Sequence, residues 1–92
     1  MKEIIYRTLF AVSQKYELRI AIGEPVKGDM TREIERELCQ HIRNITPEQR
    51  LVINQTAMLF ASRLTGDVLD EYTASLGENM IDCYERINKV LE

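Results

Sequence analysis

The chain of 92 residues is short enough for one domain (1–92), and its composition, 45% hydrophobic and 29% charged, is typical of a globular fold rather than a disordered chain. A formal net charge of -3 disfavours a nucleic-acid binder that works by neutralising phosphates. Two cysteines and one histidine provide neither a disulfide framework nor a zinc site, and four glycines and two prolines favour a few long helices over many short strands.

The first expected helix covers residues 2–22. Its apolar residues recur every three or four positions, which places them on one face of a helix. They are Ile5, Leu9, Val12, Tyr16 and Ile20. Gly23 and Pro25 predict the end of this helix, because glycine takes the left-handed cap and proline cannot continue a helix. The alternative for residues 17–22 is a short strand, since "ELRIAI" partly alternates and contains two β-branched residues.

The second expected helix spans about residues 31–44. Asp29 or Thr31 can cap it by accepting a hydrogen bond from a backbone N–H group. Its apolar face consists of Ile34, Leu38, His41 and Ile42. The opposite face mixes acids and bases at spacings of three and four residues, a pattern typical of a solvated helix surface.

The third expected helix spans about residues 47–64 and has the clearest start signal of the chain, "TPEQ". Thr46 suits the N-cap, Pro47 suits the first helical position, and Gln49 completes a capping box. Thr65 and Gly66 are expected to end the helix.

The uncharged stretch "LVINQTAMLFAS" lies inside this third helix. Its apolar side chains spread round the whole circumference, and a helix that is apolar on every side is normally buried. We therefore expect the third helix to be the apolar centre of the domain. The other helices can leave part of it uncovered, and a second copy of the chain would then cover that part, so a homodimer is expected.

The last expected element is one long C-terminal helix over about residues 67–91. Its apolar spacing continues through Gly77, which can bend the helix or, alternatively, split it in two. Acidic residues concentrate along this segment and are candidates for binding a partner. They are Asp70, Glu71, Glu78, Asp82 and Glu85. Two functional interpretations are a dock for a basic protein and an acidic DNA-mimic inhibitor; the plainer one is a solvated face that maintains solubility.

Four basic residues cluster in sequence around the first loop: Arg19, Lys27, Arg32 and Arg36. Arginine forks and free N–H groups at a helix start can hold a small anion, so a small helical enzyme that acts on an anionic metabolite is one hypothesis. Exposed ion pairs with neighbouring glutamates are the competing interpretation. His41 and Cys39 are two positions apart on a helix and point in different directions, so they do not form a catalytic or metal-binding pair.

Residues 31–64 also resemble a helix-turn-helix, with two helices joined by a short connection. The second helix would read DNA, yet it is nearly all apolar, and Gln49, Arg50 and Arg63 are its main candidates for contacts with bases or phosphates. Tyr6, Phe10 and Tyr84 lie at the margins of the apolar stripes. They either widen the core faces or form an exposed recognition patch, and we favour the first interpretation.

The sequence therefore predicts an all-α, four-helix bundle-like single domain with an apolar central third helix. "MKEIIYRTLF" mixes charged with apolar residues and is not typical of a signal peptide, so we expect a cytoplasmic protein without membrane segments, metal or cofactor. The expected function is non-catalytic: a regulatory or adaptor protein, such as a bacterial or phage accessory protein, that binds another protein as a homodimer. A nucleic-acid-binding regulator, a small enzyme and an acidic inhibitor remain the alternatives.

Overall fold

The computed structural model describes residues 2–66 and 75–92, and these ranges contain four helices and no strand. The helices are α1 (Lys2–Ala21), α2 (Lys27–His41), α3 (Pro47–Thr65) and α4 (Leu76–Leu91). The all-α, four-helix bundle-like fold is thus confirmed, and residues 17–21 are helical rather than a strand.

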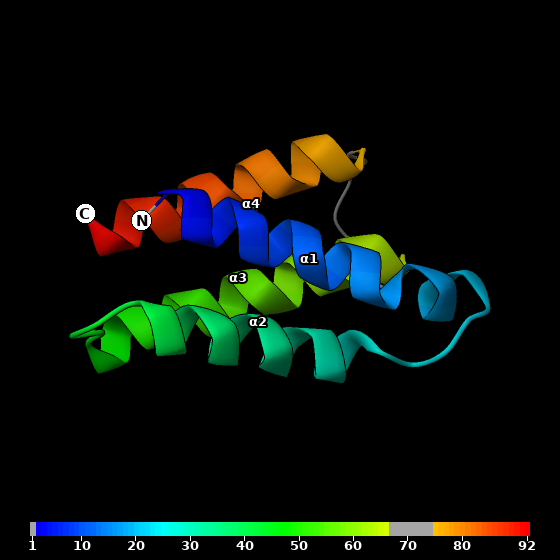
Figure 1. Cartoon of the computed structure of the whole chain (residues 1–92), viewed down its shortest axis with the longest axis horizontal. Helices are drawn as coiled ribbons and strands as arrows, with labels where there is room; N and C mark the ends of the chain where they lie inside the picture. The colour runs from blue at the N-terminus through cyan, green and yellow to red at the C-terminus, as the bar shows by residue number, and fades with distance from the viewer. Residues whose placement is uncertain (1, 67–74) are drawn as a thin grey trace.

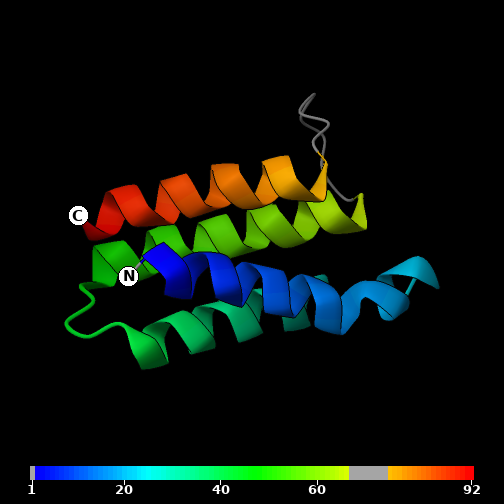
Figure 2. The ribbon, with the colours of Figure 1, turned by 45° about the horizontal axis from the view of Figure 1, so that its top comes forward.

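Successive helices run in opposite directions, as in an up-down-up-down bundle (Figure 1). Each helix packs against its two neighbours in the ring α1–α2–α3–α4, whereas α1 and α3 lie diagonally and contact each other little. The start of α1 and the end of α4 lie at the same end of the bundle (Figure 2).

A single apolar core lies between the four helices. Four residues of the predicted face of α1 are buried and the fifth, Ile20, is partly buried; Ile34 and Leu38 of α2 are buried as well. Further fully buried apolar residues come from α2, α3 and α4: Met30, Ile53, Ala57, Phe60, Ala61, Met80, Cys83 and Ile87. Each large apolar side chain of this core contributes about 1.5–3 kcal/mol through burial.

The end of α1 follows from its glycine. The backbone N–H of Gly23 donates to the carbonyl of Ile20, and that of Glu24 donates to the carbonyl of Arg19. This is the Schellman pattern, and it requires the left-handed conformation that Gly23 adopts, with φ of 81°. The predicted end of the first helix is confirmed.

The predicted boundaries of the second helix are wrong by several residues. α2 begins at Lys27 with Val26 at the N-cap position and no side-chain cap, so Asp29 and Thr31 lie inside its first turns. Val26 and Met30 are buried in the core. Their burial outweighs the roughly 1 kcal/mol that a polar cap offers. α2 ends at His41, because Ile42 turns to an extended conformation and enters the core.

The start and end of α3 follow the prediction. The Thr46 hydroxyl accepts from the Gln49 backbone N–H at 3.1 Å, and the Gln49 side-chain oxygen accepts from the Thr46 N–H at 2.9 Å. The Gln49 amide also donates to the carbonyl of Val90 at 3.1 Å, which ties the start of α3 to the end of α4. Gly66 ends the helix with φ of 73°.

The third helix is apolar, and the other helices leave part of it uncovered, as the sequence allowed. One face carries fully buried side chains, but Leu51 is 57% exposed and Met58 45% exposed. In a bundle of four helices, each helix has two neighbours and one diagonal partner. Its outward face therefore remains in solvent.

The prediction of one continuous helix over 67–91 is also wrong. Ser75 has an extended conformation and caps α4, and its hydroxyl accepts from the Glu78 N–H at 3.3 Å. The helix therefore begins at Leu76, and Gly77 lies in its first turn rather than at a bend. The part of the prediction that concerns residues 67–74 lies outside the described residues.

Candidate functional site

The most conspicuous surface feature is a set of apolar side chains along the α1–α4 seam. We call it the aromatic surface and define it as Tyr6, Phe10 and Tyr84; Ile81 lies three residues before Tyr84 on the same helix. Tyr6 and Phe10 are 42% and 48% exposed, and Ile81 is also exposed. The rings of Tyr6 and Tyr84 meet edge to face, with centroids 6.5 Å apart. An exposed apolar cluster of this kind is typical of an interaction site.

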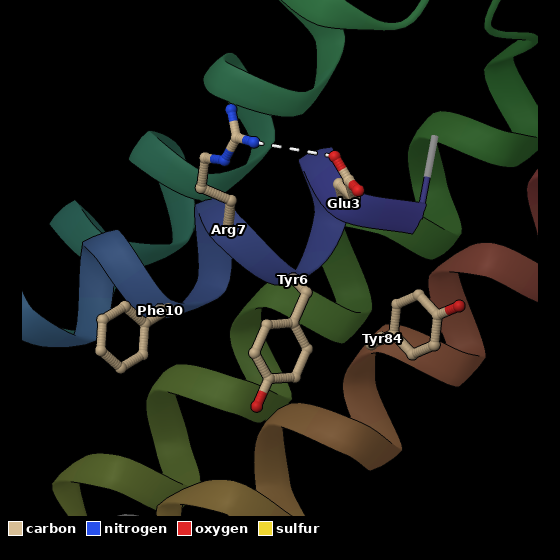
Figure 3. Close-up of a pocket in the computed structure, with 5 residues that line it drawn as sticks. All are labelled: Glu3, Tyr6, Arg7, Phe10 and Tyr84. Atoms are coloured by element: carbon tan, nitrogen blue, oxygen red, sulfur yellow. Dashed lines mark ion pairs between the residues drawn. The ribbon is translucent and has the colours of Figure 1, made fainter.

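An open hollow of about 600 Å³ lies over this surface. Three aromatic rings and one ion pair line it, and Figure 3 shows that the rings come from both α1 and α4. The pair joins Arg7 to Glu3 at 3.8 Å on the α1 side. The hollow therefore has an apolar floor and a charged margin.

The earlier preference for these aromatics as core residues is confirmed for Tyr84 alone, which packs against the core. Tyr6 and Phe10 instead point outward. Sequence reasoning missed Ile81 altogether. A usable signal was present, because Ile81 lies off the apolar stripe of α4 and three residues before Tyr84, which places the two on neighbouring positions of one helix face.

A second exposed apolar region lies on the outward face of α3. We call it the α3 surface and define it as Leu51, Val52, Gln55, Met58 and Leu59. Beside it runs a groove of about 640 Å³ between α3 and α4. The groove is lined by Val52, Gln55, Thr56, Leu59, Arg86, Lys89 and Val90. The groove thus has apolar side chains of α3 on one side and two basic side chains of α4, Arg86 and Lys89, on the other.

The candidate acidic residues do not form one uninterrupted acidic face. Glu78 and Glu85 are exposed on α4. Asp82 instead accepts from Arg63 at 2.6 Å and from Arg86 at 3.1 Å. The hydrogen bond from Arg63 is the main reason that the pKa of Asp82 lies below its ordinary value of 3.8. The candidates Asp70 and Glu71 lie outside the described residues.

Arg63 and Asp82 belong to a polar network between α3 and α4. The Arg63 side chain is only 7% exposed, and its guanidinium also donates to the side-chain oxygen of Asn79 at 3.3 Å. Asn79 is buried, and its side-chain amide donates to the carbonyl of Phe60. The Cys83 thiol donates to the side-chain oxygen of Asn79. Burial raises the pKa of Cys83 to about 11. Hydrogen bonds among these groups link α3 to α4, which is the arrangement of a structural contact between helices.

The four basic candidates around the first loop are not assembled into an anion site. Arg19 donates to Glu24 at 2.7 Å and lies 3.9 Å from Asp29. Arg32 also pairs with Asp29. Arg36 is exposed on α2, and Lys27 is half-buried at the start of α2. Carboxylates are therefore already paired with two of the three guanidinium groups, those of Arg19 and Arg32.

The helix-turn-helix hypothesis has a similar difficulty. Arg50 pairs with Glu35 at 2.9 Å, and the amide of Asn54 donates to the same carboxylate at 3.0 Å. Arg63 is nearly buried, as described above. The basic residues that would contact phosphates or bases are therefore engaged between helices.

Two further findings concern the part of the chain that the structure describes. No group of three or more histidine, cysteine, aspartate or glutamate residues there could hold a metal ion. None of the described helices has the length and apolar character needed to cross a membrane.

Comparison with known proteins adds no further constraint. No protein-family model matches the chain, and no curated protein and no solved structure is similar enough to count as a match.

Proposed function

We propose that this protein is a non-catalytic regulatory or adaptor protein that binds another protein through the aromatic surface. The observation that supports the proposal is the pair of half-exposed aromatic side chains, Tyr6 and Phe10, at the margin of an open hollow. Aromatic residues dominate the energetic centres of protein interfaces, because they bury a large area with few rotatable bonds.

The surroundings of the aromatic surface indicate the chemistry of the partner. Glu78 and Glu85 are exposed, and they lie three residues before and four residues after Ile81, so they flank it on α4. On α1 the charge of Arg7 is offset by Glu3. The margin is therefore acidic overall, and it fits a partner segment that combines apolar with basic side chains, such as an amphipathic basic helix.

The experiment compares partner capture by the parent chain with capture by two charge variants. Phe10→Glu places a carboxylate in the hollow, while Leu18→Glu is a matched control, since Leu18 is a strongly exposed apolar residue of the same helix outside the hollow. A protein retained from a lysate of the source organism should be identified and its dissociation constant measured. We expect Phe10→Glu to weaken binding by at least about 30-fold.

Leu18→Glu should leave the dissociation constant unchanged. A double variant, Glu78→Gln with Glu85→Gln, should weaken binding at low salt and remove most of its salt dependence. The proposal is contradicted if the two glutamate substitutions on α1 have equal effects, or if no protein is retained under any condition.

A further inference from the structure

The α3 surface has an internal symmetry in its sequence. In "LVINQTAML" the apolar surface residues lie three and four positions before Gln55, as Val52 and Leu51, and three and four positions after it, as Met58 and Leu59. On a helix these positions share one face with Gln55 at its centre, because steps of three and four residues return to nearly the same direction.

Such a pattern is self-complementary when two copies of the helix pack antiparallel. A two-fold axis through Gln55 brings Leu51 of one copy beside Met58 of the other, and Val52 beside Leu59, twice each. The two Gln55 side chains then meet on the axis, where the amide of each can donate to the carbonyl oxygen of the other. Every apolar member of the surface thereby meets an apolar side chain.

The charges beside the α3 surface favour the same arrangement. Lys89 and Arg86 line the groove with Val52 and Thr56, near the first half of α3. Asp82 is already paired with Arg63 and Arg86. This pairing leaves Lys89 in the groove and the exposed Glu78 at the opposite end of α4 as the charges that a second copy can pair. An antiparallel pair brings the basic end of one α4 towards the acidic end of the other, whereas a parallel pair would bring like charges together.

We propose that the α3 surface is a homodimer interface in which a second copy of this chain packs antiparallel, with Gln55 on the two-fold axis. The α3 surface and the aromatic surface have different apolar residues and share only the exposed Glu78 at their margins, so substitutions of Met58 and Phe10 test them separately. The dimer would present two aromatic surfaces to a partner, but the inference does not depend on the proposed function, and each can fail without the other.

Site-specific cross-linking tests the position of the axis. In a Cys39→Ser background, Gln55→Cys should form an intermolecular disulfide under mild oxidation, because the two residues meet across the axis. Glu48→Cys is the matched control, being exposed and two helical turns from Gln55 on the same face. In an antiparallel pair the two residues at position 48 lie about 21 Å apart, so they should not cross-link.

The solution mass tests the surface itself. The parent chain should sediment with the mass of two chains at high concentration and dissociate on dilution. Met58→Glu should sediment as one chain with an unchanged helical circular dichroism spectrum, because Met58 is half-exposed and its replacement buries no charge in the monomer. Leu18→Glu should remain a dimer, and binding of a partner through Phe10 should persist in the Met58→Glu monomer.

Three outcomes would overturn the inference: a parent chain that is monomeric at every concentration, a Met58→Glu variant that remains a dimer, or equal cross-linking at positions 48 and 55. The last outcome would indicate a parallel pair. None of the three affects the proposed function, whose test depends on Phe10.

Discussion

The two faces of α3 have the same kind of side chains and opposite surroundings. Ile53, Ala57 and Phe60 are fully buried among the other helices, whereas Leu51 and Met58, one or two positions away in sequence from buried neighbours, remain about half-exposed. Apolar character alone therefore does not say whether a side chain stabilises the monomer or is available to a partner. The number of neighbours that the bundle provides on each side decides this.

The aromatic surface extends the same lesson to α1 and α4. Tyr84 packs against the core while Tyr6, in edge-to-face contact with it, is 42% exposed. One half of the pair belongs to the fold and the other is available for binding. Variants of the buried and exposed residues should consequently separate effects on stability from effects on association.

The largest expected effect comes from the buried face of α3. Phe60→Ala should lower the free energy of unfolding by about 3–5 kcal/mol, because it removes a fully buried ring and leaves a cavity. Urea unfolding followed by circular dichroism measures the change. A loss below about 1 kcal/mol would show that the core is not where the structure places it.

The polar network of Arg63 and Asp82 between α3 and α4 should have the next largest effect on stability. Asp82→Asn should cost about 1.5–3 kcal/mol at pH 7, because it leaves the nearly buried Arg63 without its carboxylate. The folded pKa of Asp82 is depressed, so its contribution is present above its ordinary pKa of 3.8 and is lost as the pH falls through the lower folded value. The difference between parent and variant should therefore shrink in acid; a difference that is constant down to pH 2 would exclude this origin.

Removing the cap of α3 should have a smaller effect. Thr46→Ala should cost about 1 kcal/mol, because the Gln49 backbone N–H loses the hydroxyl that accepts its hydrogen bond. Thr46→Ser keeps an acceptor at the same position and serves as the control. The prediction does not hold if both variants unfold at the same urea concentration.

The smallest expected effect on folding comes from the outward face of α3. Met58→Gln should change the free energy of unfolding by no more than about 0.5 kcal/mol when measured at a dilution at which the chain is monomeric, as is usual for exposed positions. At high concentration the same variant should destabilise the chain relative to the parent, since it weakens the dimer. Equal behaviour at both concentrations would remove the contrast between the two faces.

Much of the fold was predictable from local signals. The "TPEQ" capping box and the glycine after α1 were interpreted correctly, because each depends on hydrogen bonds between residues a few positions apart. The start of α4 was missed although Ser75 and Glu78 have the spacing of a capping signal. The apolar spacing that continues through Gly77 favours one helix over 67–91, but the cap at Ser75 begins α4 at Leu76.

The candidate binding residues were less predictable, because exposure depends on how the helices are arranged. Arg19, Arg32 and Arg63 looked available in the sequence and are paired with carboxylates that lie five, three and nineteen residues away. Tyr6 and Phe10 looked like core residues and are exposed. Spacing along one helix gives the direction of a side chain, but it does not say which helices stand in that direction.

The sequence by itself determined that this protein is helical, where α1 ends and α3 begins, and which side chains form the main inner face of α1, since these depend on backbone caps and on the period of a single helix. The tertiary structure alone decided that the outward face of α3 and the aromatic surface remain uncovered. Four helices in a ring enclose one core, and any apolar side chain that points away from that core meets solvent until another chain covers it.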